Sequence, residues 1–104
     1  MATTIQMERH AEQAAAFLAA LASPHRMKIL CQLSDGEKCV SDLIAATGIP
    51  QTSMSQHLAK LKKEGIVVFR REHRTLLYAI VNPLASAIMV LLSDHYCKPR
   101  KKHP

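Results

Sequence analysis

The sequence lacks the segments that mark membrane and secreted proteins. Its longest strongly apolar stretch, residues 84–92, is too short to cross a bilayer. Residues 1–9 have no apolar segment behind a basic start, so they do not form a secretory signal. We therefore expect a cytoplasmic protein with no membrane partner.

The sequence also lacks the patterns of an enzyme or of a domain whose fold is stabilised by a bound metal ion. It shows no nucleophile–base set and no phosphate-cradling glycine loop, and it has only three glycines. Its three cysteines, Cys31, Cys39 and Cys97, are an odd number without a C-x-x-C pair, which is a poor disulfide framework and a poor zinc-ribbon pattern. We expect no enzyme, no cofactor and no bound metal. The cysteines are either buried apolar residues or reactive thiols.

Acidic residues are scarce in the second half of the chain. The 104 residues, the size of a single domain, carry a net charge of +6. Residues 51–75 hold six Lys or Arg against two Asp or Glu, whereas residues 1–50 hold four against five. This asymmetry favours a surface that binds a polyanion such as double-stranded DNA. Solubility alone is the other explanation for the basic charge.

Helical periodicity and capping residues predict five helices. Ser23 followed by Pro24 is an N-cap and first-turn pair, and Asn82 followed by Pro83 is another. Gly48 ends the third helix. The predicted helices cover residues 7–21, 24–35, 40–47 with Cys39 at the N-cap, 52–64, and 83–96.

The pattern changes from helical to alternating after residue 65. Residues 66–71 and 75–80 read as two strands of a hairpin that turns at Glu72, His73 and Arg74. The order α-α-α-α-β-β-α predicts a mainly α fold with a β-hairpin wing (α+β), a winged helix-turn-helix. We predict one such domain over residues 1–104, with a disordered basic tail at 98–104.

The fourth predicted helix has a polar face that suits the major groove of DNA. Short hydroxyls and amides near its start can contact base edges, and later lysines can contact phosphates. The candidate DNA-binding residues on this helix are Gln51, Thr52, Ser53, Ser55, Gln56, Lys60 and Lys63. An ordinary solvated helix face is the alternative. His57 lies beside the apolar stripe, and we favour a hydrogen bond inside the domain for it.

The predicted hairpin is basic around its tip. Arg70, Arg71, His73 and Arg74 suit phosphates or a narrow minor groove. Protection of a strand edge by charge is the alternative. A basic wing beside a polar helix face favours DNA more strongly than either feature alone.

The first and last helices carry more apolar surface than so small a domain can cover by itself. We therefore predict a homodimer through these two helices, which would place two recognition helices on successive major grooves of a palindromic operator. The residues assigned to this interface are Ala14, Leu18, Leu21, Ile88, Leu91 and Leu92.

Several runs together resemble the ArsR/SmtB family, small dimeric winged-helix repressors that leave DNA when an inducer binds. The resemblance covers about residues 11–97. The matching runs are SPHRMKIL at 23–30, VSDL at 40–43, TG at 47–48, SQHLAKL at 55–61 and the Arg70-Arg71 pair. It implies a DNA-binding transcriptional repressor.

The resemblance also bears on the inducer. Arsenic and cadmium sensors of the family carry a Cys-Val-Cys-Asp-Leu run, but this chain has Ser41 in place of the second thiolate. The zinc and cobalt ligands of the last helix are mostly replaced. Cys31 and Cys97 instead resemble the pair of the persulfide-sensing branch, where the two cysteines trap reactive sulfur species and DNA is released.

The resemblance leaves three points open. Periodicity places Cys31 on the stripe of Met27 and Leu30, so a buried apolar role is its alternative. Cys39 is a possible accessory thiol, because a helix N-terminus acidifies a cysteine. A metal-responsive or general thiol-redox-responsive repressor of the same family is the alternative function.

Overall fold

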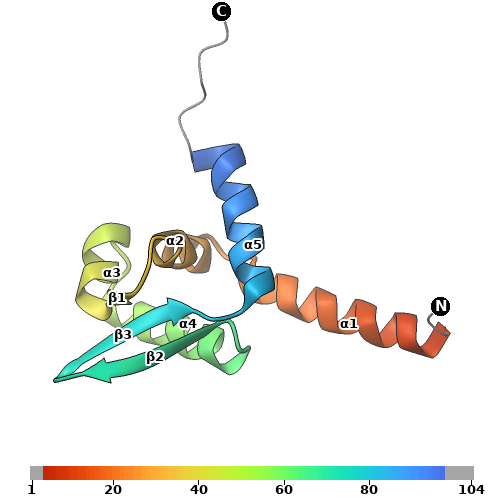
Figure 1. Ribbon diagram of the computed structural model, residues 1–104, viewed down its shortest axis with the longest axis horizontal. Helices are drawn as coiled ribbons and strands as arrows, with labels where there is room; N and C mark the ends of the chain where they lie inside the picture. The colour runs from red at the N-terminus through yellow and green to blue at the C-terminus, as the bar shows by residue number, and fades with distance from the viewer. Residues whose placement is uncertain (1–3, 98–104) are drawn as a thin grey trace, which may run out of the picture.

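The computed structural model describes residues 4–97 and confirms a winged helix-turn-helix (Figure 1). The elements are α1 (Thr4–Leu21), α2 (Pro24–Leu33), β1 (Lys38–Cys39), α3 (Val40–Thr47), α4 (Gln51–Lys63), β2 (Val67–Glu72), β3 (Thr75–Ile80), α5 (Pro83–Leu92) and the π-helical turn η1 (Ser93–Cys97). The predicted tail at 98–104 lies outside the described residues.

The wing is the β2–β3 hairpin, and it belongs to a three-stranded antiparallel sheet. Strands β2 and β3 pair from Val67 opposite Ile80 to Glu72 opposite Thr75, which places His73 and Arg74 at the tip. The short strand β1 pairs with the other edge of β3. It was not predicted, because two residues are too few to show an alternating pattern.

The helix boundaries follow local capping chemistry. The Ser23 hydroxyl accepts the Arg26 backbone N–H at 3.2 Å, and the Asn82 side chain accepts two backbone N–H groups at the start of α5. Gly48 ends α3 with a φ of 75° that a side chain would oppose, so the chain turns sharply into α4. The largest differences from prediction are at the two ends of the chain, where α1 begins at Thr4 and the last helix changes to a π-turn at Ser93. Helix α2 ends at Leu33, two residues earlier than predicted, and both ends of α4 lie one residue earlier.

The core lies between α2, α3, α4, α5 and the sheet, and the end of α1 contributes to it. It holds the apolar stripe of α4 together with side chains from the neighbouring elements, among them Leu30, Leu43, Met54, Leu58, Leu61, Ile66 and Met89. Because this stripe is buried, the opposite face of α4 faces outward at a fixed angle to the wing. The core therefore holds α4 and the wing in place relative to each other.

Helices α1 and α5 project from this core in different directions (Figure 1). In α1 only Ala20 and Leu21 are buried, whereas Leu18 is 52% exposed. The assignment of Leu21 to a dimer interface is therefore wrong, because its own domain covers it. In the part of the chain that the structure describes, no helix is long and apolar enough to span a membrane.

Candidate DNA interface and sensing thiols

The polar face of α4 lies on the surface, as its sequence predicts. Six of the seven candidate residues are exposed, and Ser53 is half-buried. The helix begins at Gln51, one residue earlier than predicted, with Pro50 at the N-cap. Lys60 pairs with Glu64 at 3.2 Å, one turn further along. The exposed candidates are Gln51, Thr52, Ser55, Gln56, Lys60 and Lys63.

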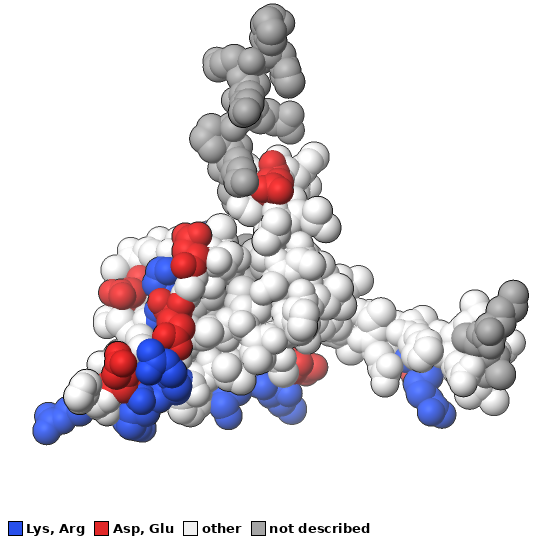
Figure 2. All heavy atoms as spheres, viewed as in Figure 1, with Lys and Arg blue, Asp and Glu red and all other residues white. Residues whose placement is uncertain are grey.

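Basic side chains of the wing and of α4 share one edge of the molecule. Figure 2 shows Lys and Arg along this edge, from the tip of the β2–β3 hairpin past α4, with most of the acidic residues set back from it. Arg71, His73 and Arg74 are all exposed on the hairpin. This distribution presents the wing and the polar face of α4 to the same side, as binding to one duplex requires.

Arg70 differs from the other wing residues because an acidic side chain engages it. Its Nε and Nη2 donate to the two carboxylate oxygens of Glu37 at 2.7 and 2.9 Å, and its Nη1 lies 3.4 Å from Glu72. The paired guanidinium lowers the pKa of Glu37, and the carboxylate raises that of Arg70. Glu37 directly precedes β1, so this pair joins the wing to the body of the domain. No sequence signal could link residues so far apart in the chain.

The His57 side chain makes its polar contacts within the domain, as predicted from its position beside the apolar stripe of α4. The Arg26 Nη1 lies 3.4 Å from its Nδ1, and its Nε2 lies 3.3 Å from the Nδ1 of His25. Burial, Arg26 and His25 lower the pKa of His57. Because a guanidinium can only donate, Nδ1 accepts and the proton of neutral His57 lies on Nε2, facing His25.

Arg26 extends this network to α1. Its Nε donates to the carbonyl oxygen of Ala20 at 2.6 Å, at the C-terminal end of α1. One side chain at the start of α2 therefore touches both the end of α1 and the middle of α4. In the sequence, Arg26 stands only within the run SPHRMKIL, and no local pattern there indicates a contact with α1 or α4.

Cys31 borders an apolar cavity of about 290 Å³. The thiol is half-buried on α2, and the other walls come from the same helix, α5 and η1. Cys97 is the last residue of η1, and its side chain lies outside the described part of the structure. Ser93 and Tyr96 of η1 line the cavity, so the segment that ends in Cys97 contributes to the surroundings of Cys31.

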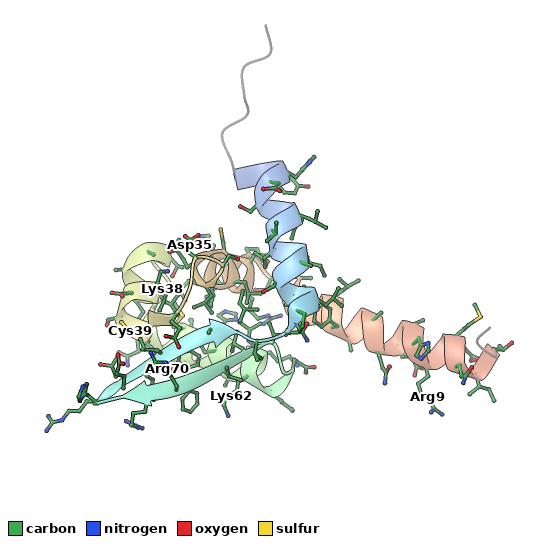
Figure 3. The ribbon with its side chains drawn as sticks, viewed as in Figure 1. Arg9, Asp35, Lys38, Cys39, Lys62 and Arg70 are labelled. Carbon is green, nitrogen blue, oxygen red and sulfur yellow. The ribbon has the colours of Figure 1, made fainter. Side chains whose placement is uncertain are left out.

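Cys39 lies in a different environment. It is half-buried at the junction of β1 and α3, where it is the N-cap, and its Sγ lies 3.4 Å from the Ser41 hydroxyl. Figure 3 shows it beside the sheet, on the side of the domain away from α1. It borders a second cavity of about 260 Å³ to which Arg74 contributes. Among residues 4–97, no group of three or more His, Cys, Asp or Glu is arranged to hold a metal ion.

Comparison with known proteins decides the family. Residues 23–68 match the family described as "Bacterial regulatory protein, arsR family". The chain is 38% identical over 98 residues to the HTH-type transcriptional regulator YgaV of Escherichia coli, an alignment that covers 93% of this chain and 99% of YgaV. The chain belongs to the ArsR family. It is a DNA-binding transcriptional regulator and not an enzyme.

Solved structures of ArsR-family relatives share the whole fold. Reduced HlyU from Vibrio cholerae has a TM-score of 0.85 at 36% identity, covering 88% of this chain and 97% of HlyU. The transcriptional repressor BigR from Xylella fastidiosa has a TM-score of 0.80 at 32% identity, covering 94% and 100%. The predicted winged-helix fold and the predicted family are therefore both confirmed.

Proposed function

We propose that this ArsR-family protein is a cytoplasmic homodimeric repressor that senses reactive sulfur species. In the reduced state it binds a palindromic operator, and modification of Cys31 and Cys97 releases the DNA. The observation that carries the proposal is the half-buried Cys31 thiol, in a cavity to which the Cys97-bearing segment contributes. The similarity to the repressor BigR and the regulator YgaV supports it.

The DNA-binding part of the proposal assigns different roles to α4 and the wing. Gln51, Thr52, Ser53, Ser55 and Gln56 read base edges, and Lys60 and Lys63 contact phosphates. Arg71, His73 and Arg74 contact the backbone or the minor groove beside α4. Arg70 instead holds the wing in place through Glu37.

The dimer in this proposal uses the projecting helices. Leu18 of α1 and Leu91 of α5 are 52% and 68% exposed, and both helices have further exposed apolar residues. A two-fold axis that pairs these helices would bury their apolar surfaces and present two α4 helices to DNA.

Sensing follows from thiol exchange chemistry. The Cys31 thiolate attacks the terminal sulfur of a persulfide, its S–S bond breaks, and the donor leaves as a thiolate while Cys31 becomes a persulfide. The Cys97 thiolate then attacks the Cys31 sulfur and expels HS⁻, which leaves a bridge between the two residues. A second sulfur transfer before this closure retains extra sulfur in the bridge.

Binding to DNA tests the proposal directly. The reduced protein first selects a duplex from a random pool, and fluorescence anisotropy then follows that duplex during treatment with an alkyl persulfide. We expect affinity to fall about tenfold or more, within the usual 1–3 kcal/mol range of allosteric coupling, and to recover with dithiothreitol. Cys31→Ser and Cys97→Ser should each remain bound, whereas the control Cys39→Ser should release like wild type. Full release by Cys31→Ser would disprove the sensing role.

A further inference from the structure

Lys62 of α4 and Phe69 of the wing are in contact. The Lys62 ammonium lies over the Phe69 ring, 5.3 Å from its centroid, within the usual range of a cation–π interaction. Tyr78, directly opposite Phe69 on β3, packs against the same ring, with the two ring centroids 5.4 Å apart and the ring planes tilted by 50°. The contact therefore joins the last turn of α4 to both long strands of the wing.

The charge of Lys62 is available to an anion. The side chain is exposed, and no carboxylate within residues 4–97 forms an ion pair with it. Lys60 of the same helix instead engages Glu64 at 3.2 Å. An ammonium has three N–H donors, and a ring on one side of it leaves the others free to donate. The Phe69 ring thus orients Lys62 without neutralising its charge.

The contact lies in the angle between α4 and the wing. Side chains alternate between the two faces of a strand, so Val67, Phe69 and Arg71 share the face of β2 that meets α4. Along this face Val67 is buried in the core, Phe69 contacts Lys62, and Arg71 is exposed. Figure 3 shows Lys62 beneath β2, at the edge of the molecule where Figure 2 shows Lys and Arg.

A helix in the major groove and a wing in the adjacent minor groove have a sugar–phosphate strand between them. We propose that Lys62 binds a phosphate of this strand and that Phe69 positions its ammonium for the contact. This inference rests on the proposed placement of α4 and the wing on DNA, and it adds a phosphate-binding residue between them. The ring restricts a flexible side chain before DNA binds, so less conformational entropy is lost on binding.

The salt dependence of DNA binding tests the phosphate contact. The full-length reduced protein and Lys62→Gln are each titrated onto the duplex selected from the random pool, between about 50 and 200 mM salt. We expect Lys62→Gln to reduce the slope of log K against log salt by roughly 0.9, the value for one phosphate contact. Arg71→Gln is the positive control, because the wing should lose one phosphate contact with it.

A double-mutant cycle tests the role of the ring. Phe69 is 41% exposed, and Phe69→Leu keeps an apolar side chain there but removes the aromatic face. This change should weaken DNA binding about two- to fivefold when Lys62 is present, the range of an exposed cation–π contact, and should have no effect in the Lys62→Gln chain. Phe69→Tyr keeps a ring and should bind like wild type. A general loss of wing stability would instead weaken binding equally in both backgrounds, and urea denaturation measures it directly.

Two results would overturn the inference. One is an unchanged salt slope for Lys62→Gln while Arg71→Gln lowers it, which would leave the wing on DNA without a phosphate at Lys62. The other is an equal loss of affinity from Phe69→Leu with and without Lys62, which would make the ring a structural contact only. If neither Lys62→Gln nor Arg71→Gln changes the slope, the proposed placement of the wing on DNA fails as well.

Discussion

At the scale of single residues, Arg26 connects three helices, α1, α2 and α4. It donates to the last turn of α1 and to His57 of α4 from the third helical position of α2. The link to His57 requires a neutral imidazole, since a protonated Nδ1 cannot accept a hydrogen bond. Helix α4 is thereby tied to α1 and α2 through a group whose pKa is lowered from its ordinary value of 6.5.

This link predicts an acid sensitivity of the fold. The pKa of His57 is lowered from its ordinary value of 6.5, chiefly by burial and then by Arg26 and His25. As the pH falls through this value, the unfolded chain takes up the proton before the folded chain, so the free energy of unfolding decreases. The loss begins near pH 6.5 and continues down to the lower pKa of the folded state.

Urea denaturation at pH 7.5 and pH 5.5 measures this effect. His57→Gln keeps a polar side chain at this position but cannot titrate, so it should lose less stability than wild type between the two pH values. The other histidines and the carboxylates change the free energy of unfolding equally in the wild type and the variant, so they cancel in the comparison. Equal losses in the two proteins would show that His57 is not the titrating group.

At the scale of elements, the wing is attached to the body at two places. Strand β1 pairs with β3, and the Glu37–Arg70 pair joins the residue before β1 to β2. Figure 3 shows Arg70 on the hairpin close to β1 and Cys39. The wing is thus held relative to α4 while the arginines nearer its tip remain exposed.

Two arginine substitutions distinguish anchoring from phosphate contact. Arg71→Gln should weaken binding on all duplexes and reduce the slope of log K against log salt by roughly 0.9, the value for one phosphate contact. Arg70→Gln should change this slope less, since Glu37 already engages its guanidinium. The measurement is anisotropy between 50 and 200 mM salt, in steps of about 50 mM. A larger change of slope for Arg70→Gln would reverse the two assignments.

Sequence predicts the elements that depend on local chemistry. Ser23 and Asn82 accept backbone N–H groups within three residues, and Gly48 needs only its own φ, so their helix ends were predicted correctly. The polar face of α4 was predicted because helical periodicity alone places its residues on one side of the helix. Such signals need no knowledge of the tertiary structure.

Sequence does not predict features that arise from distant contacts. Glu37 and Arg70 are 33 residues apart, and nothing in the sequence around either residue indicates that the other is its partner. Leu18 and Leu21 look alike in the periodic pattern, yet only Leu21 is covered by the core. Strand β1 exists only because β3 lies beside it. These features determine where the wing points and which apolar surface remains for a partner.

At the scale of the whole molecule, α2 joins the two halves of the proposed mechanism. It carries Cys31 beside the cavity, and its first turn carries Arg26, which contacts α4 and α1. A bridge from Cys31 to Cys97 would fix α2 to the end of the last helical segment. The coupling needs only a few kcal/mol, in the usual range of about 1–3 kcal/mol. In the proposed dimer, such a bridge would shift α2 and so change the spacing of the two α4 helices.

The mass of the protein after sulfur transfer tests the central claim most directly. The reduced chain is treated with an alkyl persulfide and, separately, with hydrogen peroxide, and intact mass and peptide mapping locate the products. We predict a bridge between Cys31 and Cys97 that retains extra sulfur after the persulfide and is absent after peroxide. The same plain disulfide with both reagents, or no product at either cysteine, would contradict persulfide sensing.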